Sequence, residues 1–257
     1  MTAPPVPQPP MNVLAFDTAT ERMAVALQAP GGPWHVNAEG GAAASATLLP
    51  QVHGLLAAAG LAATALQFVA FGRGPGAFTG LRTACAVAQG LGFGLGCPLL
   101  AVDSLLIVAE DARVQSPGGA FEGAAAFDIA VAMDARMDEA YAAVYRWQCG
   151  AWQVLQAPAL YTLQALSATL QHGTPLRAVA GSAWAAFGAR LPVPQGAALC
   201  AEEVDRAAAL LRLALRAAAA GEGIDAAQAL PLYLRDKVAH TTQERQAQRT
   251  AARAAPP

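Results

Sequence analysis

The chain has 257 residues, enough to bury one large core or two modest ones. Hydrophobic residues make up 55% of it and charged residues only 13%, roughly half of ordinary usage, which argues against a disordered chain and predicts a surface poor in charge. The formal net charge of −2 provides no global basic field, so unaided binding to nucleic acid is not expected.

Two uncharged stretches, residues 40–72 and 83–102, are long enough to cross a bilayer as helices. Both contain proline, glycine and polar residues, which argues against insertion, and no signal-peptide pattern precedes them. Residues 1–10 are rich in proline and have little to bury, which predicts a disordered leader. We therefore expect a cytoplasmic protein that does not enter the membrane.

The cysteines and histidines show no spacing typical of a metal site. The cysteines form no Cys-x-x-Cys pair and are expected to be buried free thiols in a reducing cytoplasm: Cys85, Cys97, Cys149 and Cys200. No two histidines form a His-x-x-x-His pair, and no Gly-x-Ser-x-Gly nucleophile motif occurs. The sequence thus predicts no metal site and no catalytic residue.

The first half of the chain alternates strand and helix patterns. Three antiparallel strands are expected at residues 13–16, 23–28 and 34–38. A helical stripe begins at Ser45 and ends at Gly60: Leu48, Leu49, Val52, Leu55, Leu56 and Ala59. The next expected elements are strand 67–71, helix 81–95, strand 98–102 and helix 105–110. Together they predict a mixed sheet with helices packed on it.

A second unit is expected after the turn at residues 116–119. Its predicted elements are strands 127–133 and 139–146, helix 162–171, strand 177–180 and helix 202–220. The charged turn 134–138 joins the first two strands and is either solvated or faces a cleft.

The stretch 74–80 between strand and helix is expected to be a turn: Gly74, Pro75, Gly76, Ala77, Phe78, Thr79 and Gly80. Free amides at a helix start suit either an anion or the close approach of another backbone. No lysine follows Gly80, so this is not a P-loop. Asp17 and Thr18 end the first strand, where the carboxylate either serves a metal or a proton, or closes an Asx turn.

Helix 81–95 is lined with alanine and glycine, which lets another backbone approach closely. We therefore expect it to pack tightly against the sheet or against a second subunit.

Six segments, in this order along the chain, resemble the TsaB (YeaZ) family: LAFDTAT at 14–20, LLP at 48–50, GRGPGAFTGLR at 72–82, VDSL at 102–105, MDARMDEAY at 133–141 and PLYLR at 231–235. The resemblance implies an α/β ASKHA fold, the two-subdomain architecture of actin, Hsp70 and sugar kinases, with mixed sheets flanked by helices. The implied parts are an N-terminal subdomain at 11–110, rejoined by about 222–238, and a C-terminal subdomain at 111–221. The leader at 1–10 and a tail at 240–257, both expected to be disordered from their composition, lie outside the resemblance.

The resemblance also implies a non-catalytic dimerisation subunit of the complex that transfers threonylcarbamoyl to N6 of the adenosine beside the tRNA anticodon. Its implied partners are a TsaD-like catalytic subunit, a TsaE-like ATPase and tRNA reached through the complex, with a homodimer when the chain is alone. No cofactor of its own is implied, and ATP with magnesium at the complex interface stays open. The expected partner interface is Leu49, Val52, Leu56, Arg82, Ala86, Gln89 and Gly90, and the expected anion-proximal set is Asp17, Thr18, Gly74, Pro75, Gly76, Phe78, Thr79 and Gly80.

Two other enzyme classes stay open beside this interpretation. One is a free-standing ATPase or small-metabolite kinase of the same fold, with Asp17 on magnesium. The other is a metallopeptidase, suggested by a historical name of related proteins. Two departures from the family stand out: Ala44 lies where members often have histidine, and the tail carries Arg245, Arg249 and Arg253, which suggest direct tRNA contact.

Overall fold

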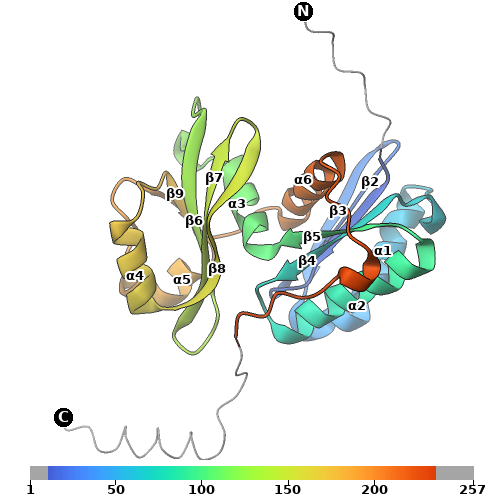
Figure 1. Ribbon diagram of the computed structural model, residues 1–257, viewed down its shortest axis with the longest axis horizontal. Coiled ribbons are helices and arrows are strands. Elements are labelled where there is room, and N and C mark those ends of the chain that lie inside the picture. Colours follow the sequence, from blue (N-terminus) through green and yellow to red (C-terminus); the bar gives the residue numbers. More distant parts are fainter. Residues whose placement is uncertain (1–10, 236–257) are drawn as a thin grey trace, which may run out of the picture.

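The computed structural model describes residues 11–235, and it contains two five-stranded mixed sheets with helices α3 and α6 between them (Figure 1). The predicted leader 1–10, the tail 240–257 and its three arginines lie outside the described residues. No helix within residues 11–235 is both long and apolar enough to cross a membrane.

The first sheet has the strand order β3-β2-β1-β4-β5. An antiparallel meander of three strands continues into two strands parallel to the first. The strands are β1 Val13–Asp17, β2 Arg22–Ala29, β3 Gly32–Glu39, β4 Phe68–Gly74 and β5 Leu99–Asp103. All five were predicted, because each is an apolar run bounded by turn residues.

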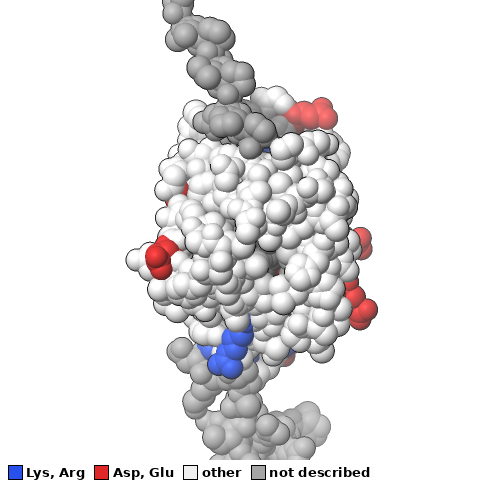
Figure 2. All heavy atoms as spheres, turned by 90° about the vertical axis from the view of Figure 1, so that its right-hand side faces the viewer, with Lys and Arg blue, Asp and Glu red and all other residues white. Residues whose placement is uncertain are grey.

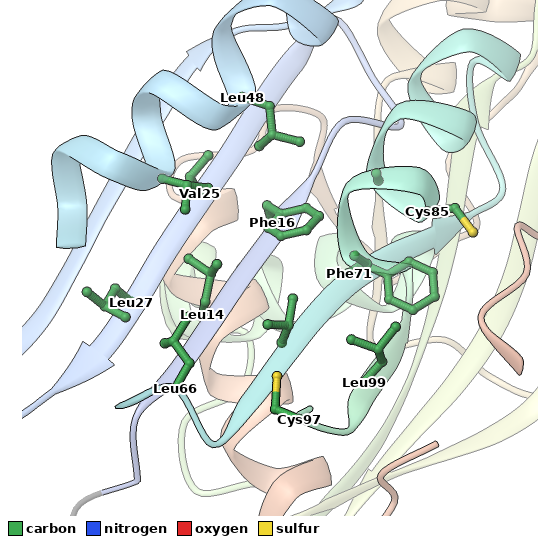
Figure 3. Packing of buried hydrophobic residues seen from close by; sticks show 14 of the residues in the cluster. Leu14, Phe16, Val25, Leu27, Leu48, Leu66, Phe71, Cys85, Cys97 and Leu99 are labelled. Carbon is green, nitrogen blue, oxygen red and sulfur yellow. The ribbon is translucent and has the colours of Figure 1, made fainter. Parts of the chain in front are cut away.

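Helices cover both faces of this sheet, so β1 is buried along its whole length. Leu14 and Phe16 face α1 (Ala44–Ala58) and α2 (Phe78–Leu95), as Figure 3 shows. Val13 and Ala15 point the other way, toward α6 (Arg206–Ala219), since successive strand residues alternate faces.

The position of α6 corrects two predictions. We expected a helix from residue 202 to 220 within the second unit, but α6 starts at Arg206 and packs on the first sheet. Its start is set by Asp205, whose side chain accepts a hydrogen bond from the Ala208 amide. An apolar stripe specifies that a helix face is buried but not which sheet buries it.

The second sheet has the strand order β10-β9-β6-β7-β8. Its strands are β6 Ala126–Asp134, β7 Glu139–Gln148, β8 Ala151–Thr162, β9 Ala178–Ala180 and β10 Ala198–Cys200. Helix α3 (Ser104–Gln115) packs on one face, and α4 (Leu163–His172) with α5 (Ala183–Phe187) on the other. The sequence analysis missed β8, α5 and β10. Strand β8 has Pro158 in its interior and lies at the sheet edge, where proline is tolerated.

After α6 the chain passes to the other face of the first sheet, on which α2 packs. Ile224 forms an antiparallel bridge with Leu99, and the Leu232 amide donates to the Arg73 carbonyl at 2.7 Å. Between these points the Ala229 carbonyl accepts a hydrogen bond from Gln89 on α2. This returning segment, residues 224–235, therefore lies along α2 and the glycine turn.

The cysteine prediction holds for three residues and is wrong for one. Cys85, Cys97 and Cys200 are buried, whereas Cys149 is exposed. Cys149 lies in the tight turn between β7 and β8 and has a φ of 52°. The exposure of Cys149 could not be predicted, because the strand after this turn, β8, was not predicted and the turn itself was therefore not recognised.

Candidate functional site

The glycine turn is shorter than predicted. Strand β4 extends to Gly74, and α2 begins at Phe78, so Phe78, Thr79 and Gly80 form the first turn of the helix. Only Pro75, Gly76 and Ala77 connect the two elements. The preceding N-cap Ala77 has no side chain that could accept from the helix amides.

The turn packs directly against the backbone that follows β1. A Cβ atom at Gly76 would overlap the Ala19 carbonyl, and one at Gly80 would overlap the Thr18 carbonyl. The Ala77 amide donates to the Ala19 carbonyl at 2.8 Å, and the Thr18 hydroxyl donates to the Gly80 carbonyl at 2.7 Å. Of the two uses predicted for these glycines, the structure shows the close approach of another backbone.

Asp17 is fully buried, and both of its oxygens are occupied. Oδ1 accepts from the Ala19 amide at 2.8 Å and from Arg206 Nη2 at 3.2 Å. Oδ2 accepts from the Ser104 hydroxyl at 2.6 Å. The contact with Ala19 is the Asx turn considered above, and the contact with Arg206 adds a buried ion pair.

Arg206 is the largest fully buried side chain among the described residues. It also pairs with Glu203 and donates to the Ser104 carbonyl. Burial by itself would lower its pKa, but the charges of Asp17 and Glu203 outweigh burial and raise the pKa above its usual range. The guanidinium is therefore permanently charged and occupies the side of Asp17 that a cation would need.

Arg206, Glu203 and Ser104 were not among the predicted site residues. Asp103 is the N-cap of α3 and accepts from the Leu105 amide at 2.9 Å. The neighbouring Ser104 donates its hydroxyl hydrogen bond to Asp17. An arginine within the otherwise apolar buried face of α6 was the one available signal for Arg206.

A cavity of about 500 Å³ lies beside this pair, between the two sheets. Its walls come from the glycine turn, the charged turn after β6 and the returning segment near residues 232–235. The charged turn thus faces the cavity through Asp134 and Arg136. Arg235 also lines the cavity and pairs with Glu139 at 2.6 Å. No cluster of three or more metal-ligating side chains occurs within residues 11–235.

The predicted partner interface divides into exposed and buried residues. Leu49, Arg82, Ala86 and Gly90 are exposed on α1 and α2. Arg82 stacks on the Phe78 ring and donates to the Tyr233 hydroxyl at 3.2 Å. Gln89 is half-buried because it donates to the returning segment.

Val52 and Leu56 are buried in the core, so their assignment to the interface was wrong. With Leu48 they repeat every fourth residue and face the sheet, which leaves Leu49 on the outside. The predicted stripe of six apolar residues is wider than the face of α1 that the sheet can cover. It therefore included residues from both the buried and the exposed sides of the helix.

The exposed side of α1 and α2 carries almost no charge. Figure 2 views the molecule from this side, with acidic residues only at the margins. Phe93 on α2 is 65% exposed and Leu49 is 42% exposed. Gly54, Gly90 and Gly94 leave open space where side chains would be. We call these five residues with Ala86 the smooth face. The prediction omitted Phe93, although it follows Gly90 by about one helical turn.

Comparisons with known proteins agree with one another. The family model described as "TsaD: tRNA N6-adenosine threonylcarbamoyltransferase" matches residues 40–254. The tRNA threonylcarbamoyladenosine biosynthesis protein TsaB of Escherichia coli K12 is 33% identical over 235 residues, which cover 89% of this chain and 96% of that protein. TsaB of Haemophilus influenzae is 37% identical over 131 residues, which cover 51% of this chain and 52% of that protein.

A solved structure, YeaZ from Pseudomonas aeruginosa, has 39% sequence identity and a TM-score of 0.75, and covers 87% of this chain and 100% of its own. The two mixed sheets with flanking helices confirm the predicted ASKHA fold class. The chain therefore belongs to the TsaB (YeaZ) family of tRNA threonylcarbamoyladenosine biosynthesis proteins.

Proposed function

We propose that this chain is a non-catalytic subunit that pairs with a TsaD-like transferase in forming N6-threonylcarbamoyladenosine in tRNA. A TsaE-like ATPase joins the pair, and any ATP and magnesium are held between subunits. The tRNA modification takes place in the cytoplasm, and the chain forms a homodimer when the transferase is absent. The observation that carries the proposal is the buried pair of Asp17 and Arg206, at the position where a kinase of this fold would need a free carboxylate.

Three features of that pair speak against nucleotide chemistry within this chain. Both oxygens of Asp17 already accept hydrogen bonds, and Arg206 places a fixed positive charge where magnesium would bind. Arg206 itself is turned away from solvent and held by two carboxylates, so it does not offer its charge to a phosphate. The Ala77 amide at the start of α2 is used by the Ala19 carbonyl.

The smooth face supports the pairing. Its small residues allow a partner helix to approach closely, and Phe93 provides a large apolar anchor of the kind that dominates binding energy at interfaces.

Ala44, at the position where relatives often have histidine, is 1% exposed and packs into the core. It therefore supports α1 from beneath and makes no surface contact of its own.

Replacing Gly90 by arginine should abolish pairing with the transferase, since it places a charge in the centre of an uncharged interface. We expect at least about a 100-fold loss of affinity, the cost of burying an unpaired charge. The free chain should fold normally, because a Cβ at Gly90 meets no atom within 4 Å. The measurement is co-purification with the transferase subunit, followed by calorimetry of the separated subunits.

The matched control is Ala168→Arg, on the exposed side of α4 beside the second sheet. It adds the same charge to a helix surface remote from the smooth face and should leave pairing unchanged. Pairing that survives Gly90→Arg, or that both variants lose equally, would refute this assignment of the interface.

Titrating the isolated chain with Mg-ATP tests the kinase alternative. We expect no heat of binding at micromolar protein and no phosphate release, because Asp17 is committed to Arg206. The same titration of Arg206→Met exposes any latent magnesium site, since it removes the competing cation. Micromolar affinity with turnover in the unaltered chain would show that it is an enzyme in its own right.

A further inference from the structure

Three arginines surround one buried carboxylate at the side of the molecule where α3 and α6 run together. Glu110 on α3 accepts two hydrogen bonds from Arg113, at 2.8 and 2.9 Å. It accepts two more, from Arg212 Nε on α6 and from Trp152 Nε1, both at 2.9 Å. Burial would raise the pKa of Glu110, but these donors outweigh it and hold the pKa below its usual range.

The third arginine, Arg216, lies one turn beyond Arg212 on α6. It adds a positive charge to the cluster, but it makes no hydrogen bond to Glu110. Its Nη1 atom is buried and has no hydrogen-bond partner within residues 11–235. Arg113 and Arg216 both lie over the ring of Trp147, with guanidinium carbons 4.3 and 4.5 Å from its centroid. The cluster thus combines three positive charges with one negative charge.

A cluster that served only to join α3 to α6 would have as many acceptors as donors. Here the two oxygens of Glu110 already take four hydrogen bonds, which leaves Arg216 without a counterpart. Burial lowers the pKa of Arg216, and the like charges of Arg113 and Arg212 lower it further while Glu110 opposes them. A bound anion would relieve that repulsion and supply the absent acceptor.

The cluster is accessible from solvent. The side chains of Arg113 and Arg212 are 22% and 32% exposed, so an anion can approach these two arginines from solvent, whereas Arg216 must shift its side chain to present its buried Nη1 atom. Arg216 lies ten residues after Arg206, which places it roughly 15 Å along α6 from the Asp17 pair. Helix α6 and the smooth face also pack on opposite faces of the first sheet.

We propose that Arg113, Arg212 and Arg216, the first and third of which lie over the ring of Trp147, form a binding site for a backbone phosphate of RNA. The choice of RNA rests on the proposed function, and the choice of phosphate rests on the geometry. Planar guanidinium groups bind phosphate through paired donors, and contact with the Trp147 ring restricts the positions that Arg113 and Arg216 can take. A partner on the smooth face and RNA at this cluster can be bound together.

The site is local, which reconciles it with a net charge of −2 for the whole chain. A single phosphate contact adds to the salt dependence of RNA binding without requiring a basic surface elsewhere. We therefore expect weak binding by the chain alone.

The test is fluorescence anisotropy of a labelled unmodified tRNA titrated with the full chain, from about 20 to 200 mM salt. Arg216→Gln should weaken binding about tenfold at the lowest salt and reduce the slope of log affinity against log salt by about 1. Arg212→Gln should act in the same direction. Arg190→Gln is the matched control, because it removes the same charge from an exposed arginine elsewhere.

Thermal unfolding of each variant confirms that the fold is intact. Equal slopes for unaltered chain, Arg216→Gln and Arg190→Gln would overturn the proposal, as would an equal change in both variants. Inorganic phosphate serves as a second probe at constant ionic strength. If it binds in the low millimolar range while tRNA does not bind, the ligand is a free phosphate and the RNA assignment is wrong.

The same variants distinguish this proposal from the proposed function. Arg216→Gln should co-purify with the transferase subunit as the unaltered chain does, because α6 is separated from the smooth face by the first sheet. Loss of the RNA effect with pairing intact would remove only this inference.

Discussion

Arg206→Met is expected to destabilise the chain by about 3–5 kcal/mol, the cost of leaving one charge of a buried pair without its partner. Asp17 is fully buried, and its remaining contacts with Ala19 and Ser104 do not neutralise its charge. Methionine restores most of the arginine's apolar length, so the loss reports the missing charge rather than a cavity. Urea unfolding followed by circular dichroism measures the change in the free energy of unfolding.

The double variant Asp17→Asn, Arg206→Met measures the interaction energy between the two side chains apart from their contacts with other residues. Because the second change removes the charge stranded by the first, the two losses should not add, and we expect a coupling of at least about 1 kcal/mol. Asp17→Asn by itself should cost less than Arg206→Met, since Glu203 still pairs with Arg206. Arg190→Met, which alters a largely exposed ion pair, should change stability by less than about 0.5 kcal/mol.

Additive losses would show that Asp17 and Arg206 act independently. An Arg206→Met variant as stable as Arg190→Met would show that the buried pair has no structural role. The pair would then no longer explain why Asp17 is unavailable to magnesium.

Gly80→Ala and Gly90→Ala, two identical changes in α2, are expected to have opposite effects. Gly80 lies against the Thr18 carbonyl, and a methyl group there must push β1 and α2 apart. Pairing of β1 with β4 resists that movement, so we expect a loss of about 2–3 kcal/mol. Gly90 faces open space, and alanine there should stabilise the free chain by about 0.5–1 kcal/mol through better helix propensity.

Thermal and urea unfolding of the two variants provide the comparison, with the unaltered chain between them. If both alanines stabilised the chain equally, Gly80 would be an ordinary helical glycine, and the close approach to Thr18 would not constrain the turn. If both destabilised it, Gly90 would be packed rather than exposed. The smooth face would then need to be redefined.

Local sequence patterns predicted most of the elements correctly. Apolar runs bounded by turn residues located β1, β2, β3, β6 and β7, and the change to a helical period located α1. These patterns suffice because strand and helix each impose their own repeat on neighbouring residues. Strand β8 was not predicted, because Pro158 and the two-residue turn after β7 interrupt its strand pattern of apolar residues.

The candidate site was predicted only in part. Asp17 and Gly80 were singled out in the sequence because strand ends and glycine-rich turns have few alternative uses, and their anion-proximal role stays a prediction. Their roles depended on partners far along the chain, with Arg206 lying 189 residues after Asp17. Likewise Val52 and Leu49 are indistinguishable by composition, and only the sheet beneath α1 decides which is buried.

The sequence by itself determined the family, the order of most strands and helices, and the need for glycine at the turn before α2. Those properties follow from short-range patterns and from motifs that contain their own physical constraint. The tertiary structure decided that α6 covers the first sheet, that Arg206 neutralises Asp17, and that Phe93 joins the smooth face. It also brought Arg216 beside Trp147. All of these features depend on contacts between segments that are distant in sequence. A local pattern of residues does not specify which distant segments come into contact.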